Sequence, residues 1–246
     1  MTRPDPESPT AAAVLVAAGG SVRMGLSGGP RKPFLKLAGR ALIERACEAF
    51  EASALVQEIV LVGHAQDLER LRELSRRSAS MAKVGVVVAG GATRAESVRQ
   101  GVTAVRPGVE VIAIHDAARP LVGVAVVELA LRVAARSGAA VVALPATDTV
   151  KISSDGEHVE RTLDRSVVWL AQTPQVFRAE VLRDLLLRAE KDGFAPTDEA
   201  ALYEKYVGGV ALVRGEATNL KVTTPADLEL AAAILRARRE REVRGS

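Results

Sequence analysis

The chain has 246 residues, of which 48% are hydrophobic and 26% charged, so it can bury a sizeable core as one α/β domain or two small ones. Its formal charge of +3 and its 3% of aromatic residues exclude a broad basic surface interleaved with stacking rings, so we expect no nucleic-acid partner. The single cysteine, Cys47, can build neither a disulfide framework nor a zinc site, which favours a reducing compartment such as the cytoplasm.

The amino-terminal residues 1–10 carry Pro, Asp and Glu and are predicted to form a flexible tail. The apolar run Ala12–Ala18 follows and ends at Gly19-Gly20. This run is too short for a transmembrane helix or a secretory signal. We therefore expect it to be the first buried strand, and we expect no membrane partner.

Further apolar runs of strand length alternate with segments of helical period. The predicted strands are Glu58–Val62, Val84–Val88, Val111–His115 and Ala139–Leu144, and the predicted helices are Ala41–Ala52, Gln66–Arg77, Arg94–Val105 and Ala125–Ser137. Continuous Val, Ile and Leu strands between amphipathic helices favour a mostly parallel sheet that is covered on both faces. With right-handed crossovers, the predicted fold class is a doubly wound, Rossmann-like α/β fold, whose ligands bind beyond the carboxyl ends of the strands.

The regular alternation stops after Pro145. Two polar, alternating runs flank Asp155-Gly156 and predict a β-hairpin. An isolated hairpin is only marginally stable in water. We therefore expect residues 149–177 to form an arm that projects from the domain and packs on a second subunit, giving a homodimer.

The α/β pattern returns after the arm and completes a single predicted domain over residues 11–238. Its last elements are a helix at Glu180–Glu190, a helix opened by Thr197-Asp198-Glu199, a strand at Val210–Val213 and a helix from Pro225. The chain after Ala237 is charged and is predicted to fray, so residues 239–246 are assigned to a tail.

The first predicted strand leads directly into a glycine-rich loop, where small residues let backbone N–H groups approach a phosphate. The loop lacks the G-x-G-x-x-G spacing of a dinucleotide site, which argues against a nicotinamide dehydrogenase. It also has Leu26 where the P-loop requires a Lys. Two cations on the loop, Arg23 and Lys32, nevertheless suit a triphosphate.

Short strings of residues follow one another along the chain in a recognisable order. They are Ala17-Ala18-Gly19 with Arg23-Met24 and Lys32-Pro33-Phe34-Leu35, Gly90-Gly91 with Arg94-Ala95-Glu96-Ser97-Val98, His115-Asp116-Ala117-Ala118-Arg119-Pro120, Asp164-Arg165 with Trp169 and Gln172-Thr173-Pro174-Gln175, and Asn219-Leu220-Lys221-Val222-Thr223. Together they resemble the 2-C-methyl-D-erythritol 4-phosphate cytidylyltransferases of the non-mevalonate route to isoprenoids. The resemblance covers about residues 12–236.

The resemblance implies an Mg²⁺-dependent transfer of CMP from CTP to the polyol phosphate, with release of pyrophosphate. In this family, cations that match Arg23 and Lys32 stabilise the α-phosphate, and cations that match Arg165 and Lys221 hold the attacking phosphate. The attacking phosphate is already ionised, so no general base is required. The arm is implied to carry its arginine, Arg165, into the site of the partner subunit.

The resemblance also implies two sets of binding residues. The nucleotide set is Ala17, Ala18, Gly19, Ser21, Gly91, Ala92, Ser97, Asp116 and Ala117, and the polyol-phosphate set is Arg119, Thr149, Arg165, Thr173 and Lys221. Asp116 directly follows a predicted strand, where this fold places ligands, and is expected to lie near the Mg²⁺. Ser21 stands where the family usually has Gly, and Ala92 where relatives are often acidic, so we expect backbone groups to select the base.

Three further residues are predicted to be structural: Cys47 as a buried small hydrophobe, His115 as a packed residue at a strand end, and Trp169 as part of the core. Two alternative functions stay open. A ribitol-5-phosphate cytidylyltransferase would share the fold and the chemistry. A non-catalytic nucleotide-binding module would tolerate the loss of Arg23, Lys32 or Lys221, all of which are present.

Overall fold

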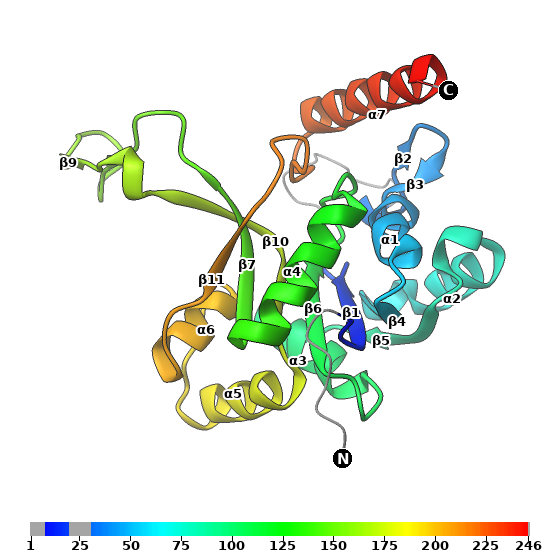
Figure 1. Ribbon diagram of the computed structural model, residues 1–246, viewed down its shortest axis with the longest axis horizontal. Coiled ribbons are helices and arrows are strands. Elements are labelled where there is room, and N and C mark those ends of the chain that lie inside the picture. Colours follow the sequence, from blue (N-terminus) through cyan, green and yellow to red (C-terminus); the bar gives the residue numbers. More distant parts are fainter. Residues whose placement is uncertain (1–7, 20–30, 246) are drawn as a thin grey trace.

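The computed structural model describes residues 8–19 and 31–245, with side chains described up to residue 241. Its centre is a seven-stranded sheet with the order β11-β7-β10-β6-β1-β4-β5 (Figure 1). These strands are β1 (Ala11–Val16), β4 (Val56–Gly63), β5 (Val84–Ala89), β6 (Val111–Asp116), β7 (Ala139–Pro145), β10 (Trp169–Arg178) and β11 (Ala211–Arg214). Neighbouring strands are parallel except where β10 pairs with β6 and β7. The predicted mostly parallel sheet is confirmed.

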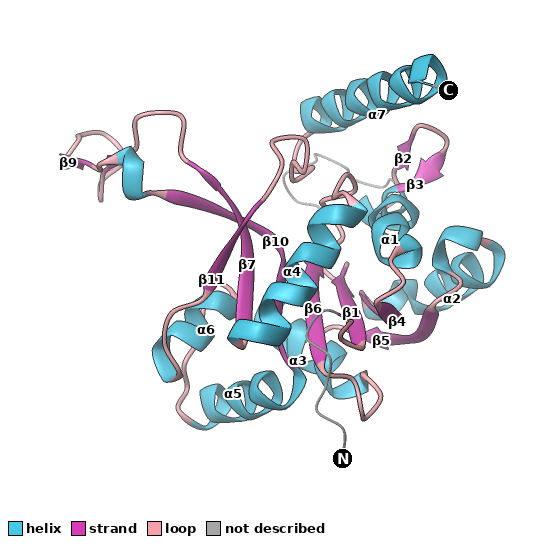
Figure 2. Ribbon diagram, in the orientation of Figure 1, coloured by secondary structure: helices cyan, strands magenta, loops and turns pink. Residues whose placement is uncertain are grey.

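Helices cover both faces of the sheet (Figure 2). They are α1 (Leu42–Ala52), α2 (Leu68–Arg77), α3 (Arg94–Ala104), α4 (Val124–Ser137), α5 (Ala179–Lys191), α6 (Glu199–Tyr206) and α7 (Pro225–Gly245). Successive side chains of a strand point to opposite faces. In β1, Leu15 therefore joins the core under α1 and α4, while Val14 joins the core under α3 and α5. Both are completely buried, which explains why this strand is apolar throughout.

The predicted hairpin is confirmed. Strands β8 (Lys151–Ile152) and β9 (Arg161–Thr162) pair in antiparallel fashion, away from the central sheet. Gly156 lies in the connection with a φ of 76°, a conformation that favours glycine. The chain leaves the sheet at β7 and returns to it at β10, so the hairpin projects from one edge of the domain (Figure 1).

The arm ends earlier than predicted, because β10 enters the sheet well before residue 177. Residues 172–177 are buried between β6 and β7. The prediction was wrong because Gln172, Thr173 and Gln175 are polar and interrupt the apolar signal of a central strand. Each is buried with a hydrogen-bonding partner elsewhere in the chain, and this hydrogen bond offsets the free-energy cost of removing the polar group from water.

Two further predictions are corrected. Trp169 is 37% exposed rather than part of the core, and its neighbour Leu170 is 54% exposed, because this end of β10 lies on the arm and outside the helix layers. The chain after Ala237 was expected to be an irregular tail, but it is helical, since α7 extends to Gly245. Helix α7 contributes Ala231 to a hydrophobic cluster that includes Leu37 of the small hairpin formed by β2 (Lys36–Leu37) and β3 (Arg40–Ala41).

Cys47 is completely buried in α1, as predicted, and burial raises the pKa of its thiol well above its usual range. Over the described ranges, none of the helices combines the length and the apolar character that crossing a membrane requires.

Candidate active site

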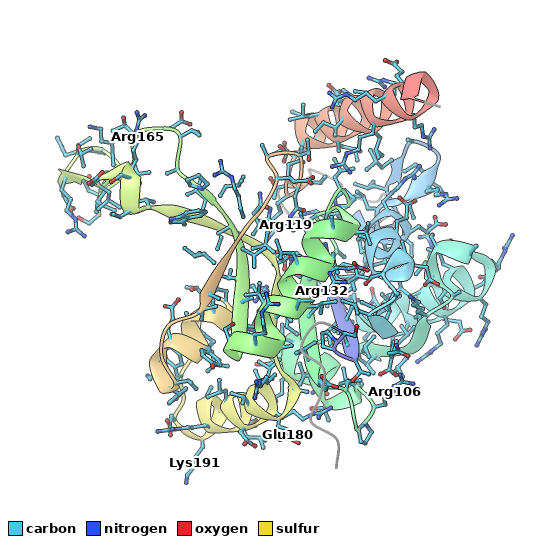
Figure 3. All side chains as sticks on the ribbon, viewed as in Figure 1. Arg106, Arg119, Arg132, Arg165, Glu180 and Lys191 are labelled. Carbon is cyan, nitrogen blue, oxygen red and sulfur yellow. The ribbon has the colours of Figure 1, made fainter. Side chains whose placement is uncertain are left out.

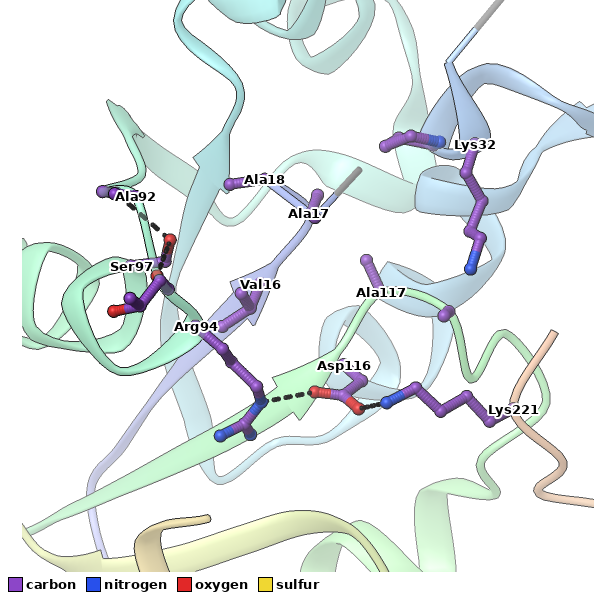
Figure 4. Close-up of a pocket in the computed structure, with 15 residues that line it drawn as sticks. Val16, Ala17, Ala18, Lys32, Ala92, Arg94, Ser97, Asp116, Ala117 and Lys221 are labelled. Carbon is purple, nitrogen blue, oxygen red and sulfur yellow. Dashed lines mark hydrogen bonds and ion pairs between the residues drawn. The ribbon is translucent and has the colours of Figure 1, made fainter. Parts of the chain in front are cut away.

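A cavity of about 250 Å³ opens where β1 and β6 end, at the edge of the sheet where a doubly wound fold binds its ligands (Figure 4). Predicted residues that line it come from five separate segments of the chain: Ala17, Ala18, Gly19, Lys32, Gly91, Ala92, Ser97, Asp116, Ala117 and Lys221. The fold thus brings together the described part of the predicted nucleotide set and two of the predicted cations. Ser21 and Arg23 lie outside the described residues.

Asp116, the last residue of β6, lies between two cations. Its Oδ2 is 2.7 Å from Nζ of Lys221, and its Oδ1 is 3.3 Å from Nε of Arg94. Burial alone would raise the pKa of Asp116, but the charges of Arg94 and Lys221 outweigh burial and lower this pKa to about 2. The carboxylate is therefore ionised and held in a fixed orientation at neutral pH.

Sequence reasoning gave no role to Arg94, although it lines the cavity. Its guanidinium donates to both carboxylate oxygens of Glu199, at 2.8 and 3.0 Å. Burial lowers the pKa of Arg94, but Glu199 and Asp116 outweigh this effect and raise it. Arg94 is the first residue of α3 and belongs to one of the recognised strings, but Glu199 is 105 residues away, so local spacing could not reveal the pair.

Lys32 lines the cavity on the same side as Lys221 (Figure 4). Its Nζ donates a hydrogen bond of 2.9 Å to the backbone oxygen of Val222. Val222 directly follows Lys221, so the two cations are held against the same short segment. This arrangement concentrates positive charge at one end of the cavity, as a polyphosphate requires.

The wall of the cavity opposite Lys32 and Lys221 is formed by the backbone around Gly91 (Figure 4). The hydroxyl of Ser97 accepts a hydrogen bond from the Gly91 N–H at 3.1 Å and donates to the Thr93 oxygen at 2.9 Å. A Cβ atom at Gly90 would lie 2.5 Å from the Cβ of Ala18, so glycine is required for this wall to pack against the first loop. Backbone groups therefore dominate this surface.

His115 is completely buried and structural, as predicted. Its Nε2 lies 3.0 Å from the Arg119 oxygen, and its Nδ1 lies 3.0 Å from Oγ1 of Thr173. The same Thr173 oxygen accepts from the backbone N–H of Asp116 at 3.1 Å. Burial lowers the pKa of His115 to about 4, so the ring is neutral and helps to fix the end of β6. Thr173 is placed beneath Asp116 rather than in the open cavity.

The rest of the predicted polyol-phosphate set is dispersed in a single chain. Arg119 is partly buried beside the cavity, where it donates to the Asn219 oxygen at 2.9 Å. Arg165 lies on the projecting arm (Figure 3), where it donates to the Thr147 oxygen at 2.8 Å. Thr149 is also exposed on the arm. None of these three residues lines the cavity.

Comparisons with known proteins agree with this geometry. Residues 11–237 match the model of the family described as 2-C-methyl-D-erythritol 4-phosphate cytidylyltransferase. The enzyme of that name from Solibacter usitatus is 40% identical over 92% of this chain and 95% of its own length. The enzyme of that name from Symbiobacterium thermophilum is 43% identical over 90% of this chain and 91% of its own.

Solved structures agree as well. The crystal structure of 4-diphosphocytidyl-2C-methyl-D-erythritol synthase from Anaerococcus prevotii has a TM-score of 0.80 and 27% identity, and the match covers 94% of this chain and 97% of that one. The crystal structure of 2-C-methyl-D-erythritol 4-phosphate cytidylyltransferase from Thermus thermophilus has a TM-score of 0.74 and 34% identity, with coverage of 91% and 98%. The chain is therefore a nucleotidyltransferase and belongs to the 2-C-methyl-D-erythritol 4-phosphate cytidylyltransferase family.

Proposed function

We propose that this protein transfers CMP from CTP to 2-C-methyl-D-erythritol 4-phosphate and releases pyrophosphate. The observation that carries the proposal is the cavity at the ends of β1 and β6, where Lys32 and Lys221 converge beside the ionised Asp116. An oxygen of the polyol phosphate would form a bond to the α-phosphorus of CTP. The bond from that phosphorus to the bridging oxygen would break, and pyrophosphate would leave.

The proposed catalytic work is electrostatic. Lys32, together with Arg23, would stabilise the negative charge that develops on the oxygens around the attacked phosphorus. Lys221 and Arg165 would hold the attacking phosphate. The attacking group is already ionised, so no base is needed, and the buried, neutral His115 is consistent with this assignment.

Base selection would depend on the backbone wall around Gly91 and Ala92 and on the backbone of Ala17 to Gly19. The Ser97 hydroxyl donates its hydrogen to the Thr93 oxygen and would therefore act mainly by holding this wall in place. A site that hydrogen-bonds an exocyclic group strongly rejects a base that lacks it. We expect nucleotide to bind first, because the glycine-rich loop would close over the triphosphate before the polyol-phosphate site is complete.

A divalent cation fits this site. Within the described ranges, no three His, Cys, Asp or Glu side chains gather into a metal site. Mg²⁺ is commonly held by one or two carboxylates together with substrate phosphates and waters. Asp116 is ionised and lines the cavity, so it would hold the ion together with the triphosphate. When bound, the ion would neutralise charge on the phosphates.

A second copy of the chain is proposed as the partner of the arm. The arm exposes several large apolar side chains, namely Val159, Val167, Trp169 and Leu170. It also carries Arg165 and Thr149 away from the cavity of its own chain. Packing on a second subunit would bury the apolar groups and bring Arg165 to the partner's cavity.

We further propose a cytoplasmic location, in line with the buried, unpaired Cys47.

Pyrophosphate release tests the proposed function. We would measure it with CTP, ATP, GTP and UTP, each against 2-C-methyl-D-erythritol 4-phosphate and ribitol 5-phosphate. The expected result is rapid release with CTP and the methylerythritol substrate only. Preferred turnover of ribitol 5-phosphate would support the sister activity instead. Binding of CTP without release with either acceptor would indicate a non-catalytic module.

A further inference from the structure

Four charged side chains form a continuous row, of which the last three line the cavity: Glu199, Arg94, Asp116 and Lys221. Asp116 is the shared anion, with one cation on each of its carboxylate oxygens. Figure 4 shows Arg94 and Lys221 approaching this carboxylate from opposite sides. The row contains two positive and two negative groups, so it is neutral as a whole.

The two cations are anchored very differently. Arg94 is held by both oxygens of Glu199, whose side chain is only 3% exposed. A planar guanidinium bound at two points has its remaining Nε–H direction fixed, and here that group points at Asp116. Lys221 is 41% exposed, carries a single flexible ammonium and lies in the segment after β11. Lys221 can therefore leave Asp116 far more easily than Arg94 can.

Glu199 is itself fixed to the central sheet. It is the first residue of α6, whose cap, Asp198, accepts from the Ala201 N–H at 2.9 Å. Gln175 of β10 donates to Asp198 at 2.8 Å and accepts from the Ala200 N–H at 3.0 Å. These hydrogen bonds fix the start of α6 to β10, the strand beside β6. The carboxylate of Glu199 thus has a defined place relative to Asp116.

We propose that Glu199 is a positioning residue for the transferase reaction, acting through Arg94 on Asp116. Lys221 leaves Asp116 for the phosphate of the acceptor, and Arg94 stays and keeps the carboxylate charge-compensated and correctly oriented. Without Glu199, the guanidinium is free to turn toward the triphosphate and to release Asp116. This inference rests on the proposed function.

The first test is the substitution Glu199→Gln, with Glu190→Gln as its matched control. Glu190 of α5 pairs with Arg99 of α3 at 2.6 Å, so the control removes the same kind of carboxylate from a different ion pair with α3, outside the cavity. Both variants are assayed for kcat, for the KM of each substrate and for Tm. We expect Glu199→Gln to lower kcat by about 10- to 100-fold, as loss of a supporting partner commonly does, with a smaller change in the KM of CTP. The control should keep the kcat of the unmodified protein.

A second test separates positioning from a general loss of folding. Glu199→Gln is combined with Arg94→Met, because methionine at position 94 removes the guanidinium through which Glu199 is proposed to act. If Glu199 acts only through Arg94, the added substitution lowers kcat no further. A merely structural role would lower activity in both backgrounds.

The outcomes of the two proposals are distinguishable. Equal kcat values for Glu199→Gln and Glu190→Gln would overturn the positioning role and leave the proposed function standing. A further loss of kcat in the Arg94→Met background would also overturn it. Absence of turnover in the unmodified protein would overturn the proposed function, and the positioning role with it.

Discussion

The strands that carry the cavity and the arm beside them differ in how their polar groups are held. Strand β6 is buried along its whole length, and Asp116 at its end has charged partners from α3 and from the segment after β11. On the arm the contacts are local, such as His158 with Asp155 and Ser166 with Asp164, and most residues are exposed. Contacts within one chain therefore hold the described lining of the cavity in place. Among the described residues, the arm lacks comparable contacts to distant parts of the chain.

The largest effect should come from the cavity. Lys32→Ala should lower kcat by about 100- to 1000-fold, because a preorganised group directed at transition-state charge commonly contributes that much. Pyrophosphate release measures the loss, and Lys36→Ala, an exposed lysine of β2, is the control. Turnover of Lys32→Ala within tenfold of the control, on the order of 1.4 kcal/mol, would contradict the role assigned to this lysine.

The next effect concerns stability. Burial lowers the pKa of His115 from 6.5 to about 4, so the unfolded chain takes up a proton before the folded one does as the pH falls. The stabilisation is complete at pH values above the pKa of His115 in the unfolded chain. It is lost as the pH decreases toward the pKa of His115 in the folded protein. The contribution is about 3 kcal/mol in the free energy of unfolding.

Urea unfolding at a series of pH values measures this contribution. His115→Gln should remove most of the decrease in stability between about pH 7 and about pH 4, since glutamine does not titrate. His158→Gln on the exposed arm should leave the decrease in place. An unchanged pH dependence in His115→Gln would show that the buried ring is not responsible.

On the arm, we expect binding rather than stability to change. Arg165→Ala should raise the KM of the polyol phosphate by about 10- to 100-fold, the loss of one charge-assisted hydrogen bond to a ligand. Its Tm should stay constant, because Arg165 is exposed and has a single described bond to the Thr147 oxygen. Arg161→Ala, on the neighbouring β9, is the control. Equal KM values for the two variants would remove Arg165 from the proposed site.

The smallest effect concerns assembly. Val167 is 75% exposed on the arm, and Val167→Asp should weaken self-association by about tenfold, because a charge in a buried apolar contact is unfavourable. Analytical ultracentrifugation over a range of protein concentrations measures the shift. Val207→Asp places the same charge on another exposed valine, just after α6, and should have no effect. A protein that is monomeric without any substitution would contradict the proposed homodimer.

The same contrast explains how much the sequence could predict. Strands such as β1 and β6 are largely apolar runs, and their predicted ends differ from the observed ones by at most two residues. The hairpin was predicted from its alternating pattern and Asp155-Gly156. The lining of the cavity was implied by the family resemblance of short strings along the chain, and the strand end at Asp116 was expected at the edge of the sheet where this fold binds ligands.

What the sequence could not predict depends on distant pairing. The polar residues Gln172 and Gln175 interrupt the apolar pattern by which a central strand is predicted. They can be buried because they bond to distant partners such as Glu216 and Asp198. Trp169 was assigned to the core by residue type alone, and it is exposed because the arm leaves the helix layers. Arg94 and Glu199 become one unit only after folding brings α3 and α6 together.

The complete burial of Cys47 has a practical consequence for spectroscopy. Its thiol is inaccessible and its pKa is raised, so it should react slowly with maleimide or nitroxide reagents. Because the sequence contains this one cysteine only, a cysteine introduced at the tip of the hairpin, for example Glu157→Cys, would carry the label almost alone. If the proposed homodimer forms, the distance between its two labels could then be followed in solution as nucleotide is added.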